Sequence, residues 1–366
     1  MEKDLGYRRV QCAGRGSLSI SLPKDWTQDI GIERGSEIAF KVQDDSSLIL
    51  VPRKIMEGRK ENEKPKRKEY FIYVDQKSDP QSIWRRITSL YVVSADLIHI
   101  HFKDSETYQK FKTAVNGLIK NALLGSEIID ETSKEITIQI LINHPDFPIE
   151  KAIRRMAVLA LSANKDATLS LRNMDQDLVQ RVFDAHADVN RLNLYVVRQL
   201  KFGLERNSFK DWGFKTPKEF LGYRIVVNDI KSIADNALNI ANNIRSLKKL
   251  IEDKMLFLKE SVDEEVYTQI LNFSSSASQL FEETLEAMFK RDFERADETI
   301  SRLESFITLE NGLITLMSSK KLDPNISSIH RLLLDNSRRI VEYSRNIAEV
   351  TLNRTVEEIS STPTPK

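Results

Sequence analysis

The sequence predicts a multidomain protein with a strand-rich N-terminal unit, a small α/β module and an all-α C-terminal region. Three patterns support this division. Serine and apolar residues alternate near the N-terminus, strand and helix patterns alternate in the middle, and apolar residues then recur every three or four positions. A chain of 366 residues also exceeds what one core usually fills. The expected parts are residues 1–53, a linker at 54–68, the α/β module at 69–143, helices at 148–358 and a disordered tail at 359–366.

The N-terminal unit is predicted to contain a strand, a short helix and two further strands. The first strand is expected to have one buried face, because apolar residues alternate with serines at Leu18, Ile20 and Leu22. Pro23 suits the first turn of the short helix, and turn residues separate the strands at 37–42 and 47–51. About fifty residues build a core too small to fold alone. We therefore expect two chains to combine into one folded unit.

Composition excludes several classes of protein. The net charge is +1 and 30% of the residues are charged, as in an ordinary soluble protein. The N-terminus lacks the apolar segment of a signal peptide, and the most apolar run, at 156–163, is shorter than a membrane span. Neither secretion nor membrane insertion is expected. The single cysteine, Cys12, forms no internal disulfide and favours the cytoplasm. We interpret it as a small strand residue, with a redox role as the alternative.

The linker is basic. Residues 53–68 contain eight bases, three acids and few apolar side chains. Such a segment would add non-specific affinity for the phosphates of a nucleic acid. The alternative interpretation is a solvated spacer.

The middle region is predicted to form an α/β layer, because strand and helix patterns alternate along it. The expected elements are strands at 70–74 and 96–102, helices at 80–92 and 106–120, and paired strands at 127–132 and 134–142. His99 and His101 lie on one face of a strand and together could ligate a metal ion. The alternative is a half-exposed strand face, since Ile98, Ile100 and Phe102 form the other face.

The C-terminal region is predicted to form antiparallel helical bundles. The expected helices begin at Pro148 and continue at 175–206, 217–253, 262–290, 292–319 and 325–358. Matching positions recur 107 residues apart, as in Arg224 and Arg331, in Ile233 and Ile340, and in the NIA motifs at 239–241 and 346–348. This constant offset predicts two copies of a three-helix unit.

Catalytic signatures are missing from the sequence. It contains no HExxH, Walker A, GxSxG, GxGxxG or CxxC motif, and its five histidines are scattered. No acid/base pair accompanies a nucleophile. We therefore do not expect an enzyme.

The N-terminal segments GRG, LPK, GIERGSEI and SLILVP occur in the order and spacing of a known DNA-binding unit. Residues 8–52 resemble the AbrB, MazE and SpoVT family, in which two chains interlock as swapped hairpins into a small β-barrel. The resemblance implies a homodimer or larger oligomer and DNA contacts from Arg8, Arg9, Arg15 and Lys24. Residues 1–53 hold eight bases and eight acids, so DNA binding must depend on the arrangement of the bases.

Three helical segments carry a second resemblance. They are IKSIADNALNIANNI at 230–244, FKRDFERADETI at 289–300 and SRRIVEYSRNIAEV at 337–350. These segments resemble the PhoU family, whose proteins are paired three-helix bundles linked to phosphate uptake. Together with the N-terminal unit, the whole chain resembles an archaeal PhoU-type regulator.

The second resemblance raises the question of a metal site, because PhoU proteins bind multinuclear metal clusters through acids one helical turn apart. Here the first acid of each pair falls on Lys231 or Arg338, which disfavours a divalent-metal or iron cluster. We expect these cations to form ion pairs with the acid one turn later. The candidate ligands are Asp184, Asp188, His186, Asp235 and Glu342. His186 is alternatively a core histidine with a hydrogen-bond partner.

These features predict a cytoplasmic DNA-binding transcriptional regulator, acting in phosphate uptake or a related nutrient response. The N-terminal barrel would bind DNA, and the helical region would sense a signal or a partner. The alternative is an adaptor that docks on a transporter or sensor protein and uses the barrel only to dimerise. A metal-storing bundle is a third possibility.

Overall fold

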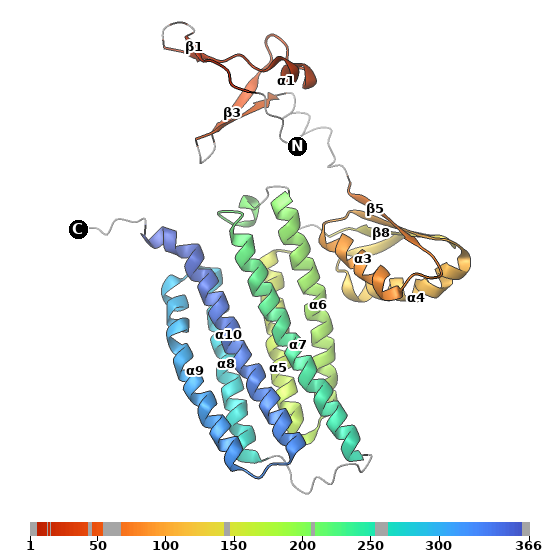
Figure 1. Ribbon diagram of the computed structural model, residues 1–366, viewed down its shortest axis with the longest axis vertical. Helices are drawn as coiled ribbons and strands as arrows, with labels where there is room; N and C mark the ends of the chain where they lie inside the picture. Colours follow the sequence, from red (N-terminus) through yellow and green to blue (C-terminus); the bar gives the residue numbers. More distant parts are fainter. Residues whose placement is uncertain are drawn as a thin grey trace, which may run out of the picture. The chain divides into compact units, whose positions relative to one another are not determined.

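The computed structural model describes residues 6–12, 14, 16–42, 46–53, 67–142, 147–205, 209–252 and 263–360. The chain divides into two compact units, Met1–Arg67 and Lys68–Lys366. Figure 1 shows the course of the chain within each unit.

The N-terminal unit consists of two antiparallel hairpins joined through a short helix. β1 (Gln11–Cys12) pairs with β2 (Leu18–Ser19), α1 (Lys24–Asp29) follows, and β3 (Ile38–Val42) pairs with β4 (Leu48–Pro52). The predicted helix and both later strands are confirmed, while the first predicted strand is shorter than expected. Cys12 lies on a strand, as predicted, and is exposed.

The apolar side chains of this unit remain uncovered within one chain. Leu18 is 72% exposed and Val42 is 75% exposed, and Ile20 and Phe40 are exposed as well. The predicted buried face of the first strand is therefore not buried in the single chain. The physical reason is that the two hairpins form separate two-stranded sheets, and neither sheet covers the other's apolar side chains.

The second unit begins with an α/β module. Its elements are β5 (Glu69–Val74), α3 (Pro80–Val92), β6 (Leu97–Phe102), α4 (Ser105–Ala122), β7 (Ser126–Glu131) and β8 (Glu135–Ile140). The sheet order is β5-β6-β8-β7, with β5 parallel to β6 and the remaining pairs antiparallel. Both helices begin where an aspartate, Asp79 or Asp104, accepts hydrogen bonds from backbone N–H groups of the first turn. Both helices lie on one face of the sheet (Figure 1).

Six long helices form the rest of the second unit. They are α5 (Ile149–Asn173), α6 (Gln176–Glu205), α7 (Glu219–Glu252), α8 (Glu264–Lys290), α9 (Phe293–Ser319) and α10 (Pro324–Ser360). The side chains of Asp175, Asp263, Asp292 and Asp323 accept hydrogen bonds from the first turns of α6, α8, α9 and α10. The predicted helix boundaries are confirmed to within two residues at nearly every end.

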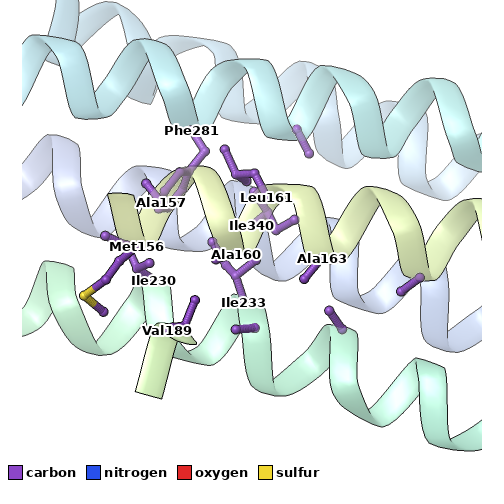
Figure 2. Close-up of a cluster of buried hydrophobic side chains, with 14 of the residues drawn as sticks. Met156, Ala157, Ala160, Leu161, Ala163, Val189, Ile230, Ile233, Phe281 and Ile340 are labelled. Atoms are coloured by element: carbon purple, nitrogen blue, oxygen red, sulfur yellow. The ribbon is translucent and has the colours of Figure 1, made fainter. Parts of the chain in front are cut away.

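The six helices form two groups of three. In one group α5, α6 and α7 pack against one another, and in the other α8, α9 and α10 do so. The two groups meet where α7 packs on α10 and where α5 packs on α8. Figure 2 shows buried side chains of several helices meeting around α5, among them Ala160, Ile230, Phe281 and Ile340. Alanines along α5 allow this close approach, because a methyl group is the smallest side chain that still packs.

The α/β module packs on α6 through α3 and α4. A small 3-10 helix, Lys210–Trp212, precedes α7. In the described part of the chain, no helix is long and apolar enough to cross a lipid bilayer.

Candidate functional site

Three of the four predicted DNA-contacting side chains are described, and all three are exposed. Arg8 and Arg9 lie just before β1, and Lys24 is the first residue of α1. Arg8 donates a hydrogen bond from Nη1 to the carbonyl oxygen of Tyr7, at 3.0 Å. Arg15 lies outside the described residues. The arrangement leaves long cationic side chains accessible to phosphate oxygens.

Acidic side chains balance these bases on the same unit. Asp25, Asp29 and Glu33 are exposed, and Glu37 forms an ion pair with Arg53. The unit therefore has little net field to attract a polyanion. Contact with DNA would depend on where the bases lie on the surface.

The candidate metal-binding residues of the first three-helix group are engaged in ion pairs and hydrogen bonds. Lys231 Nζ lies 2.5 Å from Asp235 Oδ2, one helical turn along α7. His186 of α6 has its Nε2 atom 3.0 Å from Asp235 Oδ1. Asn190 lies beside the same ring, with Nδ2 3.2 Å from Nε2. Asp235 thus joins α6 to α7, and the predicted hydrogen-bond partner of His186 is confirmed.

The second group repeats the ion pair on α10. Arg338 pairs with Glu342 one turn along, and it also lies 3.2 Å from Asp335 and 3.5 Å from Glu310 of α9. Both predicted pairs, Lys231 with Asp235 and Arg338 with Glu342, are therefore present. A metal ion would have to compete with Lys231 for Asp235 and with Arg338 for Glu342.

The remaining metal candidates, Asp184 and Asp188, contact other side chains of α6. Asp184 accepts a hydrogen bond from Gln180 at 3.0 Å, and Asp188 lies 3.8 Å from Arg191. Among the described residues, no group of three or more His, Cys, Asp or Glu side chains is placed to hold a metal ion. His99 and His101 lie on the half-exposed face of β6, while Ile98, Ile100 and Phe102 are buried on the other face, as the pattern predicted.

A buried ion network at the start of α7 was not predicted from the sequence. Glu219 is only 7% exposed, and its Oε2 atom accepts from Arg354 Nε at 2.8 Å and from Arg291 Nη2 at 3.1 Å. Its Oε1 atom accepts from the backbone N–H of Lys215 at 2.6 Å. Burial alone would raise the pKa of Glu219, but Arg354 and the Lys215 amide hold it below its usual range. The network joins α7, α10 and the C-terminal end of α8.

The internal repeat shows that the fold itself does not require these charges. A shift of 107 residues relates Glu219 to Ile326 and Leu247 to Arg354. Both Ile326 and Leu247 are buried apolar residues. A comparison of the two copies in the sequence is the signal that would have revealed the ion network, because at each of the two positions one copy has a charged residue where the other has an apolar one.

A second buried acid lies between the two groups. Asp229 of α7 accepts a hydrogen bond from Asn346 Nδ2 of α10, at 3.1 Å. Burial raises the pKa of Asp229 to about 6, and the hydrogen bond from Asn346 opposes this shift only in part. This carboxyl group changes charge near neutral pH at the contact between α7 and α10.

Comparison with known proteins assigns two segments of the chain. Residues 153–244 match the PhoU domain. This segment covers most of the first three-helix group. Residues 14–57 match the family described as antidote-toxin recognition MazE, bacterial antitoxin. The chain therefore contains a PhoU-type segment and a MazE-type segment, and both resemblances seen in the sequence are confirmed. The archaeal origin stays a prediction.

Among solved structures, the chain is similar to the crystal structure of PhoU from Pseudomonas aeruginosa. The two share 18% sequence identity with a TM-score of 0.46, over 58% of this chain and 96% of that one. No curated protein matches the chain.

Proposed function

We propose that the protein is a DNA-binding transcriptional regulator of phosphate uptake or a related nutrient response. One observation carries the proposal: a MazE-type segment and a PhoU-type segment occur on the same chain. The MazE-type unit would bind DNA, and the PhoU-type region would respond to a signal or a partner protein. A response of this kind requires a ligand that binds two states of the protein with different affinity.

Two chains would together build the DNA-binding unit. The exposed strand residues Leu18, Phe40 and Val42 support this step, because burying them against a second copy removes apolar surface from water. In the resembled family the two chains interlock as swapped hairpins. Pairing would also double the number of exposed bases, with Arg8, Arg9 and Lys24 contributed by each chain.

The salt dependence of DNA binding tests the proposal. DNA fragments recovered by genome-wide crosslinking of the protein would be titrated at several salt concentrations. Phosphate contacts predict a steep linear fall of log affinity with log salt, with a slope of roughly −0.9 per contact. Variants Arg8→Ala, Arg15→Ala and Lys24→Ala are each expected to weaken binding and flatten the slope. Lys151→Ala, at an exposed base of α5, is the matched control. A slope unchanged in all three variants would refute this site.

A second function is favoured by the charge balance of the N-terminal unit. Residues 1–53 carry as many acids as bases, which suits a dimerisation unit better than a DNA clamp. In this alternative the helical region is an adaptor that docks on a transporter or sensor protein. It predicts that the intact protein shows no salt-dependent DNA affinity, whereas crosslinking in cells captures a transporter or a sensor protein.

A further inference from the structure

The outer face of the four-stranded sheet carries aromatic side chains that nothing described covers. The helices α3 and α4 cover the opposite face, where Ile72, Ile98 and Ile138 are buried. On the outer face, Phe71 is 52% exposed and Tyr73 is 72% exposed. Exposed aromatic residues that lie together are typical of a binding surface rather than of a solvated sheet.

The aromatic rings form one continuous stack. β5 and β6 are parallel and in register, so Phe71 is paired with His99 and Tyr73 with His101. The ring centres of the two pairs lie 4.9 Å and 5.3 Å apart, with interplanar angles of 15° and 20°. Phe71 also stacks with His101, at 5.9 Å. The four rings thus present a nearly parallel, preorganised aromatic surface.

Carboxylates surround the stacked rings. Glu135 Oε1 lies 3.4 Å from His99 Nδ1, and Glu69 Oε2 lies 3.9 Å from His99 Nε2. The cross-strand register places Glu127 and Asp130 of β7 on this same face, opposite Gln139 and Thr137 of β8. The outward-facing strand residues of this sheet include these four acids and neither lysine nor arginine. The face is therefore negatively charged when its histidines are neutral.

We propose that this face binds an arginine-bearing segment of a partner protein. A guanidinium group stacks flat on aromatic rings and donates paired hydrogen bonds to a carboxylate, and both groups are present here within one surface. Single-stranded nucleic acid would also stack on the rings, but four acids would repel its phosphates. A second copy of the same face would bring like charges together. The proposal goes beyond the proposed function and does not depend on it.

Peptide binding to the full chain tests the proposal. The probe is a fluorescein-labelled peptide of alternating arginine and glycine with six arginines, measured by anisotropy at pH 8, and a lysine version serves for comparison. The arginine peptide is expected to bind about tenfold more tightly than the lysine peptide, because lysine does not stack as a planar group. The double variants Phe71→Ser/Tyr73→Ser and Glu69→Gln/Glu135→Gln are each expected to weaken binding by about tenfold.

Control variants distinguish peptide binding at this face from general electrostatic or hydrophobic attraction to the rest of the protein. Trp84→Ser changes an exposed aromatic residue on α3, and Glu304→Gln changes an exposed acid on α9; both should leave binding unchanged. In the Glu69→Gln/Glu135→Gln variant both altered side chains are partly exposed and keep their size, so we expect it to fold. It therefore tests the face even if the aromatic variant fails to fold. Equal binding by the arginine and lysine peptides would overturn the proposal. Two other outcomes would also overturn it. If the natural protein binds single-stranded RNA and the Phe71→Ser/Tyr73→Ser variant does not, the face binds nucleic acid. If the variant has a different molecular mass in solution from the natural protein, the face binds a second copy of the chain.

Discussion

Arg198 of α6 donates a hydrogen bond from Nη1 to the carbonyl oxygen of Tyr91, the residue before the end of α3, at 2.7 Å. Its guanidinium also lies 5.1 Å from the centre of the Tyr91 ring. Arg198 is only 4% exposed, and this burial lowers its pKa. One buried side chain thus attaches the α/β module to the helical region.

Replacing Arg198 is expected to loosen this attachment. Arg198→Met keeps an unbranched side chain but removes its charge and its donors, so the Tyr91 carbonyl loses the Arg198 hydrogen bond and keeps the one from the Ser94 backbone N–H. We expect a loss of about 2 kcal/mol in the free energy of unfolding. Hydrogen exchange should become faster at the C-terminal end of α3. Lys201→Met, at an exposed position of the same helix, is the control. Equal exchange in both variants would contradict the assignment.

Asp229 is expected to make the stability of the helical region depend on pH. Burial raises its pKa from 3.8 to about 6, so the folded state binds a proton more tightly than the unfolded state. The stabilising effect of that proton is fully present below about pH 4 and is lost as the pH rises through 6, by roughly 3 kcal/mol in total. Asp229→Asn should remove this dependence and should be more stable than the natural protein at pH 8.

Urea unfolding between pH 4 and pH 8 measures the effect as the difference between the natural protein and Asp229→Asn. Asp297→Asn, at an exposed position of α9, controls for the loss of one surface carboxylate. A constant difference across the pH range would show that the pKa of Asp229 is not raised.

The ion network of Glu219 provides a test based on the internal repeat. Glu219→Ile leaves the buried Arg354 and the half-buried Arg291 without this carboxylate, and Arg354→Leu leaves the acid with one guanidinium partner. Either change alone is expected to destabilise the protein by about 3 kcal/mol. The double variant Glu219→Ile/Arg354→Leu places at each position the buried apolar residue found 107 residues away in the other copy, Ile326 for Glu219 and Leu247 for Arg354. It should unfold at a higher urea concentration than either single variant; strictly additive losses would count against this explanation.

Exposed strand residues of the N-terminal unit are expected to control the oligomeric state. Phe40→Ser and Val42→Ser remove apolar surface that a second chain would bury, at about 1.5–3 kcal/mol for each fully buried side chain. Light scattering across a dilution series should show that the dimer of each variant dissociates at a higher protein concentration than the dimer of the natural protein. Leu309→Ser, at an exposed position of α9, should behave as the natural protein does. A monomer at every concentration in the natural protein would contradict the proposed pairing.

Local patterns predicted the elements of the fold well. Pro148 at a helix start and three-and-four spacing predicted the helices of the C-terminal region, and period-two alternation separated buried Ile98 and Ile100 from His99 and His101. The ion pair of Lys231 with Asp235 was predictable because residues four apart share one helical face.

Contacts between distant parts of the chain were not predictable in the same way. Arg354 meets Glu219 across 135 residues, and Arg198 meets Tyr91 across 107. Such pairs depend on how the helices pack. Helical periodicity predicts which face of a helix is buried, but not which other element packs against it. The burial predicted for the first strand was wrong for a related reason: Leu18 and Ile20 show the pattern of a covered face, but among the described residues of the single chain no side chains bury them.

Gly222 marks a point where α7 and α10 nearly touch. A Cβ atom at this position would lie 2.5 Å from Val350 Cγ1, closer than two carbon atoms can approach. If α7 slid or turned by one residue, the side chain of Leu221 or Tyr223 would enter a gap that admits only hydrogen. The close contact at this crossing therefore couples the two helical copies, and a displacement of α7 requires α10 to move with it.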